Sequence, residues 1–295
     1  MPQVSARNAT LAMLLILLGA GGVQLSSTIA VGLFNGLTPL GTSGARMLVA
    51  AVILLIVLRP QILGRTAQDW ITVVTYGVAI AGMNGFLYMA IARIPLGVAT
   101  TIDFLGPAVV ALLTSRRARE WILAVLALLG VALIAGLGGD LDPLGVVFAA
   151  IAATFFGLYT FFAPRVGGSS GGVRDLALSV SVAAVLLSPV GVPTLVSASG
   201  SQWVSLALIA LLGTALPFFV DTLAGKLSSA GMIGIFFAFD PVLGSVFGYL
   251  FLDQALTIPT IIGIALIVIA GSGIVFSASD RKPPLNGLNP EDVIR

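Results

Sequence analysis

Two polar residues, Asn84 and Tyr88, stand four positions apart in an otherwise apolar stretch of the chain. Residues four apart project from the same face of a helix, so the two side chains predict one shared polar surface. The amide of Asn84 can donate and accept hydrogen bonds, and Tyr88 offers an aromatic ring with a hydroxyl at its tip. The pair suits an amino acid or an aromatic ring as a ligand, although hydrogen bonding between helices would use the same groups.

Three further polar residues are candidates to contact the same ligand. Tyr159 would approach from the second half of the chain as another wall, with ordinary packing of its ring as the alternative. Gln24 and Ser245 also stand in apolar stretches, where an unpaired polar group is costly and usually faces a cavity or a polar partner. We therefore take Asn84, Tyr88, Tyr159, Ser245 and Gln24 as candidate substrate-binding residues.

Charged residues within the apolar stretches could form ion pairs or gates. Asp103 is expected near the outer membrane face, where Arg46 and Arg93 also fall, and an ion pair is the natural expectation. The pair could open and close as an outer gate, or Asp103 could accept a coupled proton. A static buried pair that fixes helix register is the favoured alternative. Asp221 and Lys226 could form an inner gate.

The step from Asp240 to Pro241 places a charge beside a helix breaker. Proline removes an intrahelical hydrogen bond and kinks a helix. Membranes tolerate such breaks where neighbours or a water-lined cavity satisfy the freed groups, so a carboxylate here predicts a polar hollow. With Gly244 and the counterpart step Gly106–Pro107, it predicts paired hinges that flank a central cavity. The alternative is a structural kink, with Asp240 paired to Lys226 or to another helix.

The composition requires a membrane protein. Hydrophobic residues make up 58% of the chain and charged residues 9%, against about 25% charged in soluble domains. Apolar runs of about 20 residues, the length that spans a bilayer, follow one another and lack the alternation of barrel strands. We predict an all-α integral membrane protein with ten transmembrane helices at residues 9–32, 40–58, 70–91, 96–115, 120–138, 143–163, 174–196, 202–224, 229–252 and 257–276.

The residues that the chain lacks narrow its chemistry. It has no cysteine and no histidine, which excludes thiol ligands, disulfides, imidazole metal sites and histidine catalysis. We therefore expect no metal and no cofactor. No basic run resembles a nucleic-acid patch, and the loops are too short for a nucleotide-binding domain. The expected partners are a small-molecule substrate and the lipid bilayer, and an enzyme is not expected.

The distribution of positive charge predicts the orientation. With the N-terminus inside, all fourteen Lys and Arg residues except Arg46 and Arg93 fall toward the inner face. Both termini should therefore lie in the cytoplasm, and the polar, proline-bearing tail at 277–295 should be disordered. The apolar run after Arg7 exceeds the core of a signal peptide, so it is counted as the first helix.

Two segments of the chain can be aligned with each other without a gap, which indicates an internal repeat. Residues 93–120 can be laid over 227–254, so that Gly97 meets Gly231 and Pro107 meets Pro241. This predicts two five-helix repeats, at 1–138 and 139–276, and an odd helix number makes them inverted. Inverted repeats place a substrate site near the midplane between the halves. Glycines spaced by four, such as those at 32 and 36, allow close helix approach, either within a monomer or in a homodimer.

This arrangement resembles a known family. The helix starts GVATTIDFLGP and AGMIGIFFAFDP, closed by Glu120 and Gln254, are similar to those of the EamA-type exporters of the drug/metabolite transporter superfamily. Within it, the chain resembles bacterial exporters of aromatic amino acids and of threonine and homoserine. The resemblance covers nearly the whole chain and implies alternating-access export of amino acids, aromatic ones first, across the bacterial inner membrane. The alternative is uptake or exchange of another metabolite, such as a nucleotide sugar or a drug-like compound.

Overall fold

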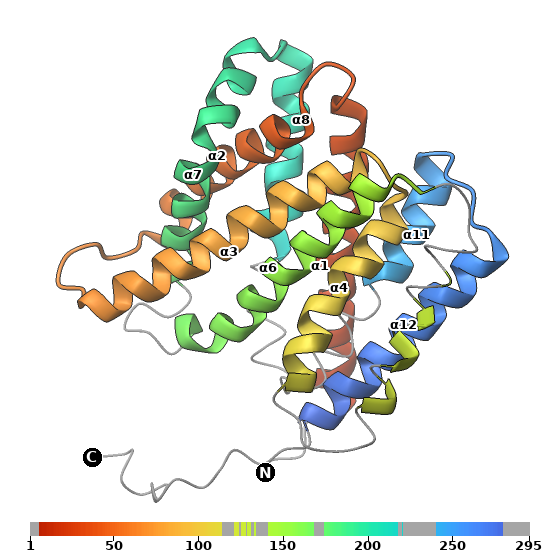
Figure 1. Cartoon of the computed structure of the whole chain (residues 1–295). Helices are drawn as coiled ribbons and strands as arrows, with labels where there is room; N and C mark the ends of the chain where they lie inside the picture. The colour runs from red at the N-terminus through yellow and green to blue at the C-terminus, as the bar shows by residue number, and fades with distance from the viewer. Residues whose placement is uncertain are drawn as a thin grey trace, which may run out of the picture.

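The computed structural model describes residues 6–113, 121–123, 125–127, 129–130, 133, 141–167, 174–217, 220 and 240–279. Within these residues the chain is helical and contains no strand, which confirms the all-α prediction. The helices, drawn in Figure 1, are α1 (Ala6–Leu33), α2 (Pro39–Leu58), α3 (Ala67–Ile91), α4 (Leu96–Leu113), α6 (Pro143–Gly167), α7 (Asp175–Ser197), α8 (Gly200–Ala210), the π-helix η2 (Leu211–Ala215), α11 (Asp240–Phe251) and α12 (Ile258–Ser279).

Most of the expected spans coincide with a helix of the structure. The expected span 40–58 is α2 and the span 174–196 is α7, each within one residue at either end. The expected fifth span, 120–138, and the first part of the ninth, 229–239, fall largely or wholly outside the described residues. The ten-helix count therefore stays a prediction.

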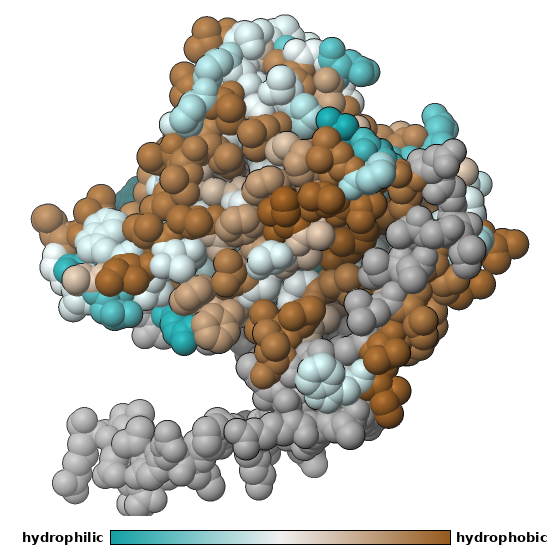
Figure 2. Space-filling model, viewed as in Figure 1, coloured by the Kyte–Doolittle hydropathy of each residue, from teal (hydrophilic) through white to brown (hydrophobic). Residues whose placement is uncertain are grey.

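The described helices have the lengths and surfaces of a membrane bundle. Five are long and apolar enough to cross a membrane, at Leu14–Leu33, Pro39–Leu58, Ala67–Ile91, Pro143–Ala163 and Asp175–Ser197. Large apolar side chains stand exposed on the helices, and Figure 2 shows apolar residues in broad patches on the visible face. An apolar surface of this extent is adapted to contact with lipid.

Local chemistry fixes where several helices begin. The side chain of Thr38 accepts a hydrogen bond from the backbone N–H of Gly41, and proline follows at the first helical position of α2. Thr66 and Asp69 form a reciprocal capping box at the start of α3, and Ser199 and Gln202 form another at the start of α8.

Helices from the two halves of the sequence pack against each other. α3 lies along α6, as Figure 1 shows, and also contacts α7, while α2 packs on α7. α4 contacts α6, α11 and α12, and α1 contacts α8, η2 and α11. At the α2–α7 crossing, a Cβ built on Gly44 would lie 2.7 Å from the carbonyl oxygen of Leu187, so glycine is required for this approach.

Two ion pairs mark the opposite ends of the bundle. Arg65, just before α3, pairs with Asp175 at the start of α7, and Arg93, just after α3, pairs with Asp142 at the start of α6. We call these ends the Arg65 end and the Arg93 end. They are separated by the 25 residues of α3, about 37 Å at the rise of an α-helix. Each ion pair joins a loop of the first half to a helix of the second.

Candidate functional site

A buried arginine lies at the centre of the first polar cluster. Arg46 of α2 is 3% exposed, and its Nη2 donates a hydrogen bond to Oδ1 of Asn84 on α3. Its guanidinium also lies over the ring of Tyr88, 4.7 Å from the ring centroid. The two residues predicted to share one face of α3 therefore do lie together, and Arg46 is the group that they contact.

The π-helix η2 closes the cluster from the second half of the chain. A Cβ built on Gly213 would lie 2.7 Å from Nη1 of Arg46 and would overlap Oγ of Ser26 on α1. Ser26 in turn donates a hydrogen bond to the carbonyl of Ile209, at 3.0 Å. The guanidinium is thus held against the backbone of η2, at a glycine that leaves room for it. Single π turns occur often at functional sites because they re-space the helix backbone.

Several polar atoms around Arg46 are buried without a hydrogen-bond partner in the described part of the chain. They are Oγ of Ser43, Nε of Arg46, the hydroxyl of Tyr88 and Oγ1 of Thr214. Ser43 stands one helical turn before Arg46 on α2, and Thr214 follows Gly213 on η2. Nearly all buried polar groups in proteins are hydrogen-bonded, so a group of such atoms indicates a place where polar ligands can be received.

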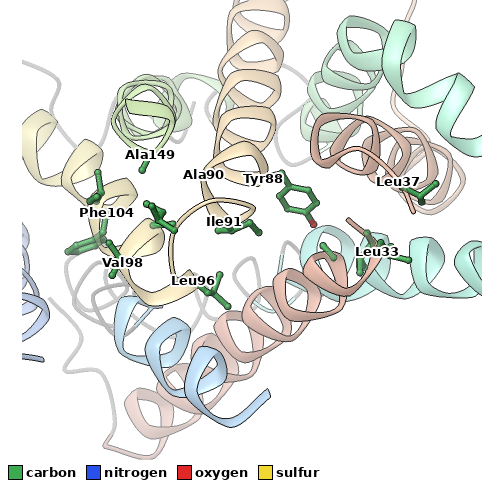
Figure 3. Close-up of a cluster of buried hydrophobic side chains, with 14 of the residues drawn as sticks. Leu33, Leu37, Tyr88, Ala90, Ile91, Leu96, Val98, Phe104 and Ala149 are labelled. Atoms are coloured by element: carbon green, nitrogen blue, oxygen red, sulfur yellow. The ribbon is translucent and has the colours of Figure 1, made fainter. Parts of the chain in front are cut away.

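Tyr88 is enclosed on all sides. It is 1% exposed, and its ring meets Phe34 edge-on with 5.9 Å between centroids. Figure 3 shows the ring in a cluster of apolar side chains that includes Leu33 and Leu37, with the hydroxyl directed away from α3. Since Arg46 covers one face of the ring, Tyr88 contributes its hydroxyl to the site more readily than a free aromatic face.

A second polar cluster joins α1, α4 and α11. Gln24, fully buried on α1, donates from Nε2 to the backbone oxygen of Asp240 at 3.3 Å, and its Oε1 has no partner among the described residues. Asp103 on α4 is 6% exposed and lies within electrostatic range of the carboxylate of Asp240. A Cβ on Gly244 would lie 2.6 Å from Oγ1 of Thr100, so glycine permits the contact of α11 with α4.

Both clusters lie at a similar depth in the bundle. Arg46, Asn84 and Asp103 each stand seven residues from the helix terminus at the Arg93 end, which corresponds to about 10 Å along each helix. The polar layer is therefore nearer to the Arg93 end than to the Arg65 end. Within the described residues, no group of three His, Cys, Asp or Glu could hold a metal ion.

The expected ion pair of Asp103 with Arg46 or Arg93 is wrong for this structure. Arg46 faces α3 and contacts Asn84, and Arg93 pairs with Asp142, with 2.8 Å between Nη1 and Oδ2. The sequence placed all three residues at one end but could not tell which helix faces each side chain. The Arg93 guanidinium, with the N–H of Leu144 as a second donor, lowers the pKa of Asp142 below its usual value.

The remaining candidates lie apart from Arg46. Tyr159 stacks on Tyr76 of α3, with 4.6 Å between ring centroids, so its ring packs between helices. Ser245 donates to the carbonyl of Pro241 and contacts the site of Gly97 on α4. Asp221 and Lys226 are outside the described residues, so the inner-gate prediction stays untested.

Of the expected hinge residues, Gly106 is a close-contact position, because a Cβ there would overlap the carbonyl oxygen of Ala153 on α6. Pro107 lies inside α4, and Pro241 is the second described residue of α11. An apolar groove of about 490 Å³ runs between α4 and α6 beside Gly106. None of these positions carries a polar group toward Arg46.

Sequence reasoning missed two residues of the site and one ion pair outside it. Ser43 stands three positions before Arg46 on α2, and this spacing alone could have pointed to it. Thr214 lies in η2, and nothing in the sequence distinguishes a π turn from an ordinary helix. The buried pair of Arg65 and Asp175 joins residues that are far apart in the chain.

Comparison with known proteins gives the family. Residues 143–276 match the EamA-like transporter family. The chain is also 30% identical over 271 residues to the threonine/homoserine exporter RhtA of Salmonella typhimurium, covering 89% of this chain and 90% of that protein. The chain belongs to the EamA-like transporter family. This EamA protein is accordingly a multi-pass membrane transporter and not an enzyme, as its sequence predicted.

Other relatives agree with this assignment. The threonine/homoserine exporter RhtA of Escherichia coli K12 is 28% identical to this EamA protein over 271 residues, covering 89% of this chain and 90% of that one. The uncharacterized transporter YvbV of Bacillus subtilis is 27% identical over 267 residues, covering 85% and 87%. A solved crystal structure, 17% identical, superposes with a TM-score of 0.61 over 93% of this chain and 98% of its own, which shows a shared fold alone.

Proposed function

We propose that this EamA transporter exports small amino acids of the threonine and homoserine class across the bacterial inner membrane by alternating access. The observation that carries the proposal is the buried polar site around Arg46. It combines side chains of α1, α2 and α3 with the backbone of η2, and therefore lies between the two halves of the chain. The relatives named above, which are threonine/homoserine exporters, support this choice of substrate.

The packing of the helices supports two inverted halves, at 1–138 and 139–276. If α1 is exchanged with α6, α2 with α7, α3 with α8 and α4 with α11, each contact that joins these helices across the two halves becomes another contact of the structure. The pair α3–α6 becomes α8–α1, and the pair α4–α6 becomes α11–α1, and both exchanged pairs are in contact. Two halves related in this way can each adopt the arrangement of the other, which is the basis of alternating access.

The proposal also assigns the orientation in the membrane, the hinges, the inner gate and the oligomeric state. The Arg93 end is the outer face in our proposal, both termini are cytoplasmic, and residues 277–295 form a cytoplasmic tail. Gly106–Pro107 and the segment from Pro241 to Gly244 would act as hinges, and Asp221 with Lys226 as an inner gate. The protein would work as a monomer or a homodimer.

The geometry favours a small hydroxylated amino acid over an aromatic one. The ring of Tyr88 is covered by Arg46 on one face and met by Phe34 at its edge, so little of the ring is free to stack on a substrate. The hydroxyls of Ser43, Tyr88 and Thr214, which have no partner among the described residues, suit a substrate that itself carries a hydroxyl. Threonine and homoserine both do.

Counterflow in proteoliposomes tests the proposal. Vesicles loaded with unlabelled compound should accumulate labelled threonine, and a panel of amino acids, nucleotide sugars and drug-like compounds gives the order of preference. Asn84→Ala removes a hydrogen bond to a charged group, which predicts a loss of exchange of about 10-fold to 100-fold at equal expression. Val57→Ala, on the lipid-facing side of α2, is the matched control and should exchange normally. Exchange of a nucleotide sugar but of no amino acid would refute the proposal.

A further inference from the structure

We infer that the guanidinium of Arg46 receives the carboxylate of the transported amino acid. This inference rests on the proposed function and adds the part of the substrate that is recognised. It concerns the α-carboxylate, which all amino acids share, and not the side chain. Arg46 is thereby a binding residue and not the gating residue that its position in the sequence predicted.

The charge of Arg46 is not balanced by an ion pair within the described residues. Two ion pairs are formed among the described residues, by Arg65 with Asp175 and by Arg93 with Asp142. Arg46 is 3% exposed, yet its hydrogen bond and its ring contact in this part of the chain are both with neutral groups. A cation in a membrane interior is costly unless an anion or several dipoles compensate it. An anionic ligand group would supply the missing compensation.

Arg46 also has a hydrogen-bond donor that is unused within the described residues. Arginine offers five N–H donors in a planar fork that matches a carboxylate with two parallel bonds. At Arg46, Nη2 is used by Asn84, whereas Nε has no partner in the described structure. The hydroxyl of Ser43, one turn earlier on α2, is also buried and unpartnered and stands on the same side of the helix. The site therefore has unused donors of two kinds.

The guanidinium of Arg46 also lies against the second half of the chain. Nη1 of Arg46 lies against Gly213, where a side chain would come within 2.7 Å of it. Glycine in the π turn therefore keeps the guanidinium in contact with the interface between the two halves. A carboxylate bound there would touch both halves at once, through Arg46 of α2 and through η2. Substrate binding would then act directly on α2 and η2, which belong to the two halves that must move relative to each other during transport.

The inference predicts a specificity rule. A compound with a free carboxylate should bind whatever its small side chain, whereas threonine amide should bind poorly although it keeps the ammonium group, the side chain and nearly the same size. In wild-type proteoliposomes, threonine should therefore compete with labelled threonine at a concentration about 10-fold to 100-fold lower than threonine amide does. Equal competition by the acid and the amide would overturn the inference.

Substitution of Arg46 tests the residue itself. Arg46→Gln should lower threonine exchange and also abolish the preference for threonine over threonine amide, and Arg46→Lys, which keeps the charge without the fork, should retain part of both. Arg165→Gln removes an exposed cation from α6 and should change neither. Purified Arg46→Gln must elute as a monodisperse species. If threonine still raises the melting temperature of the purified variant more than threonine amide does, residues other than Arg46 bind the carboxylate and the inference is wrong.

The two proposals fail in different ways. If the wild-type protein exchanges no amino acid but another small carboxylate stabilises it and does so through Arg46, the proposed function falls and the Arg46 assignment stands. If threonine is exchanged but Arg46→Gln keeps the preference for the acid over the amide, the function stands and the assignment falls.

Discussion

Removal of one partner of the buried ion pair should destabilise the protein far more than the same change at the exposed pair. Arg65 and Asp175 are joined by a contact of 2.5 Å, with side chains 4% and 0% exposed. Arg93 and Asp142 are joined at 2.8 Å, with side chains 43% and 34% exposed. Asp175→Asn preserves the size of the side chain but removes the carboxylate that is hydrogen-bonded to Arg65, and leaves only the more distant charge of Asp69 nearby.

The magnitudes differ because the two environments differ. Breaking a buried pair by removing one partner costs about 3–5 kcal/mol, which is roughly two to three and a half orders of magnitude in the unfolding equilibrium. Exposed pairs contribute about 0–1 kcal/mol, because water and salt screen them. Asp175→Asn should therefore lower the free energy of unfolding by several times the effect of any exposed pair.

Purified variants can be compared by denaturant titration in one detergent, with Asp142→Asn as the matched control. The fluorescence of Trp70, whose ring lies 5.8 Å from the guanidinium carbon of Arg65, reports on this end of the bundle. Replacing both partners by apolar residues, as in Arg65→Met with Asp175→Leu, should restore most of the free energy of unfolding that Asp175→Asn removes. If Asp175→Asn costs no more than Asp142→Asn, the reasoning from burial is refuted.

Three further predictions concern other parts of the molecule. Gly106→Ala should destabilise the bundle by about 1–3 kcal/mol and slow exchange, because the new methyl group overlaps the carbonyl oxygen of Ala153; unchanged melting of the purified variant would contradict this. Tyr88→Phe removes a buried, unpartnered hydroxyl, so stability should not fall while threonine binding weakens, and a parallel loss of both would point to a purely structural role. At the Arg93 end, Asp142 has a lowered pKa, so its stabilising effect is complete above its ordinary value of 3.8 and is lost as the pH falls through the lower folded value. The stability difference between wild type and Asp142→Asn should accordingly be constant from pH 8 to about pH 5 and shrink below it.

Helix periodicity and apolar run length were enough to locate most of the architecture. The apolar runs defined α2 and α7 almost to the residue, because a bilayer imposes both the length and the composition of a span. The spacing of Asn84 and Tyr88 predicted that they share a face, which follows from the geometry of one helix.

The partners of these residues could not be predicted, since they depend on how helices rotate against one another. Arg46 was assigned to Asp103 because both fall at the same depth, but depth does not tell which neighbour a helix face meets. Tyr159 was also expected at the site and instead stacks on Tyr76, which stands eight residues before Asn84 on α3, about 12 Å nearer the Arg65 end. The π turn of η2 arises from tertiary packing and leaves no pattern in the sequence.

A structure with threonine bound tests the central claim most directly. We predict threonine between α2, α3 and η2, with its carboxylate about 3 Å from the nitrogens of Arg46 and its contacts divided between the two halves of the chain. Threonine bound away from Arg46, for example in the groove between α4 and α6, or with its ammonium group and not its carboxylate toward Arg46, would contradict the account.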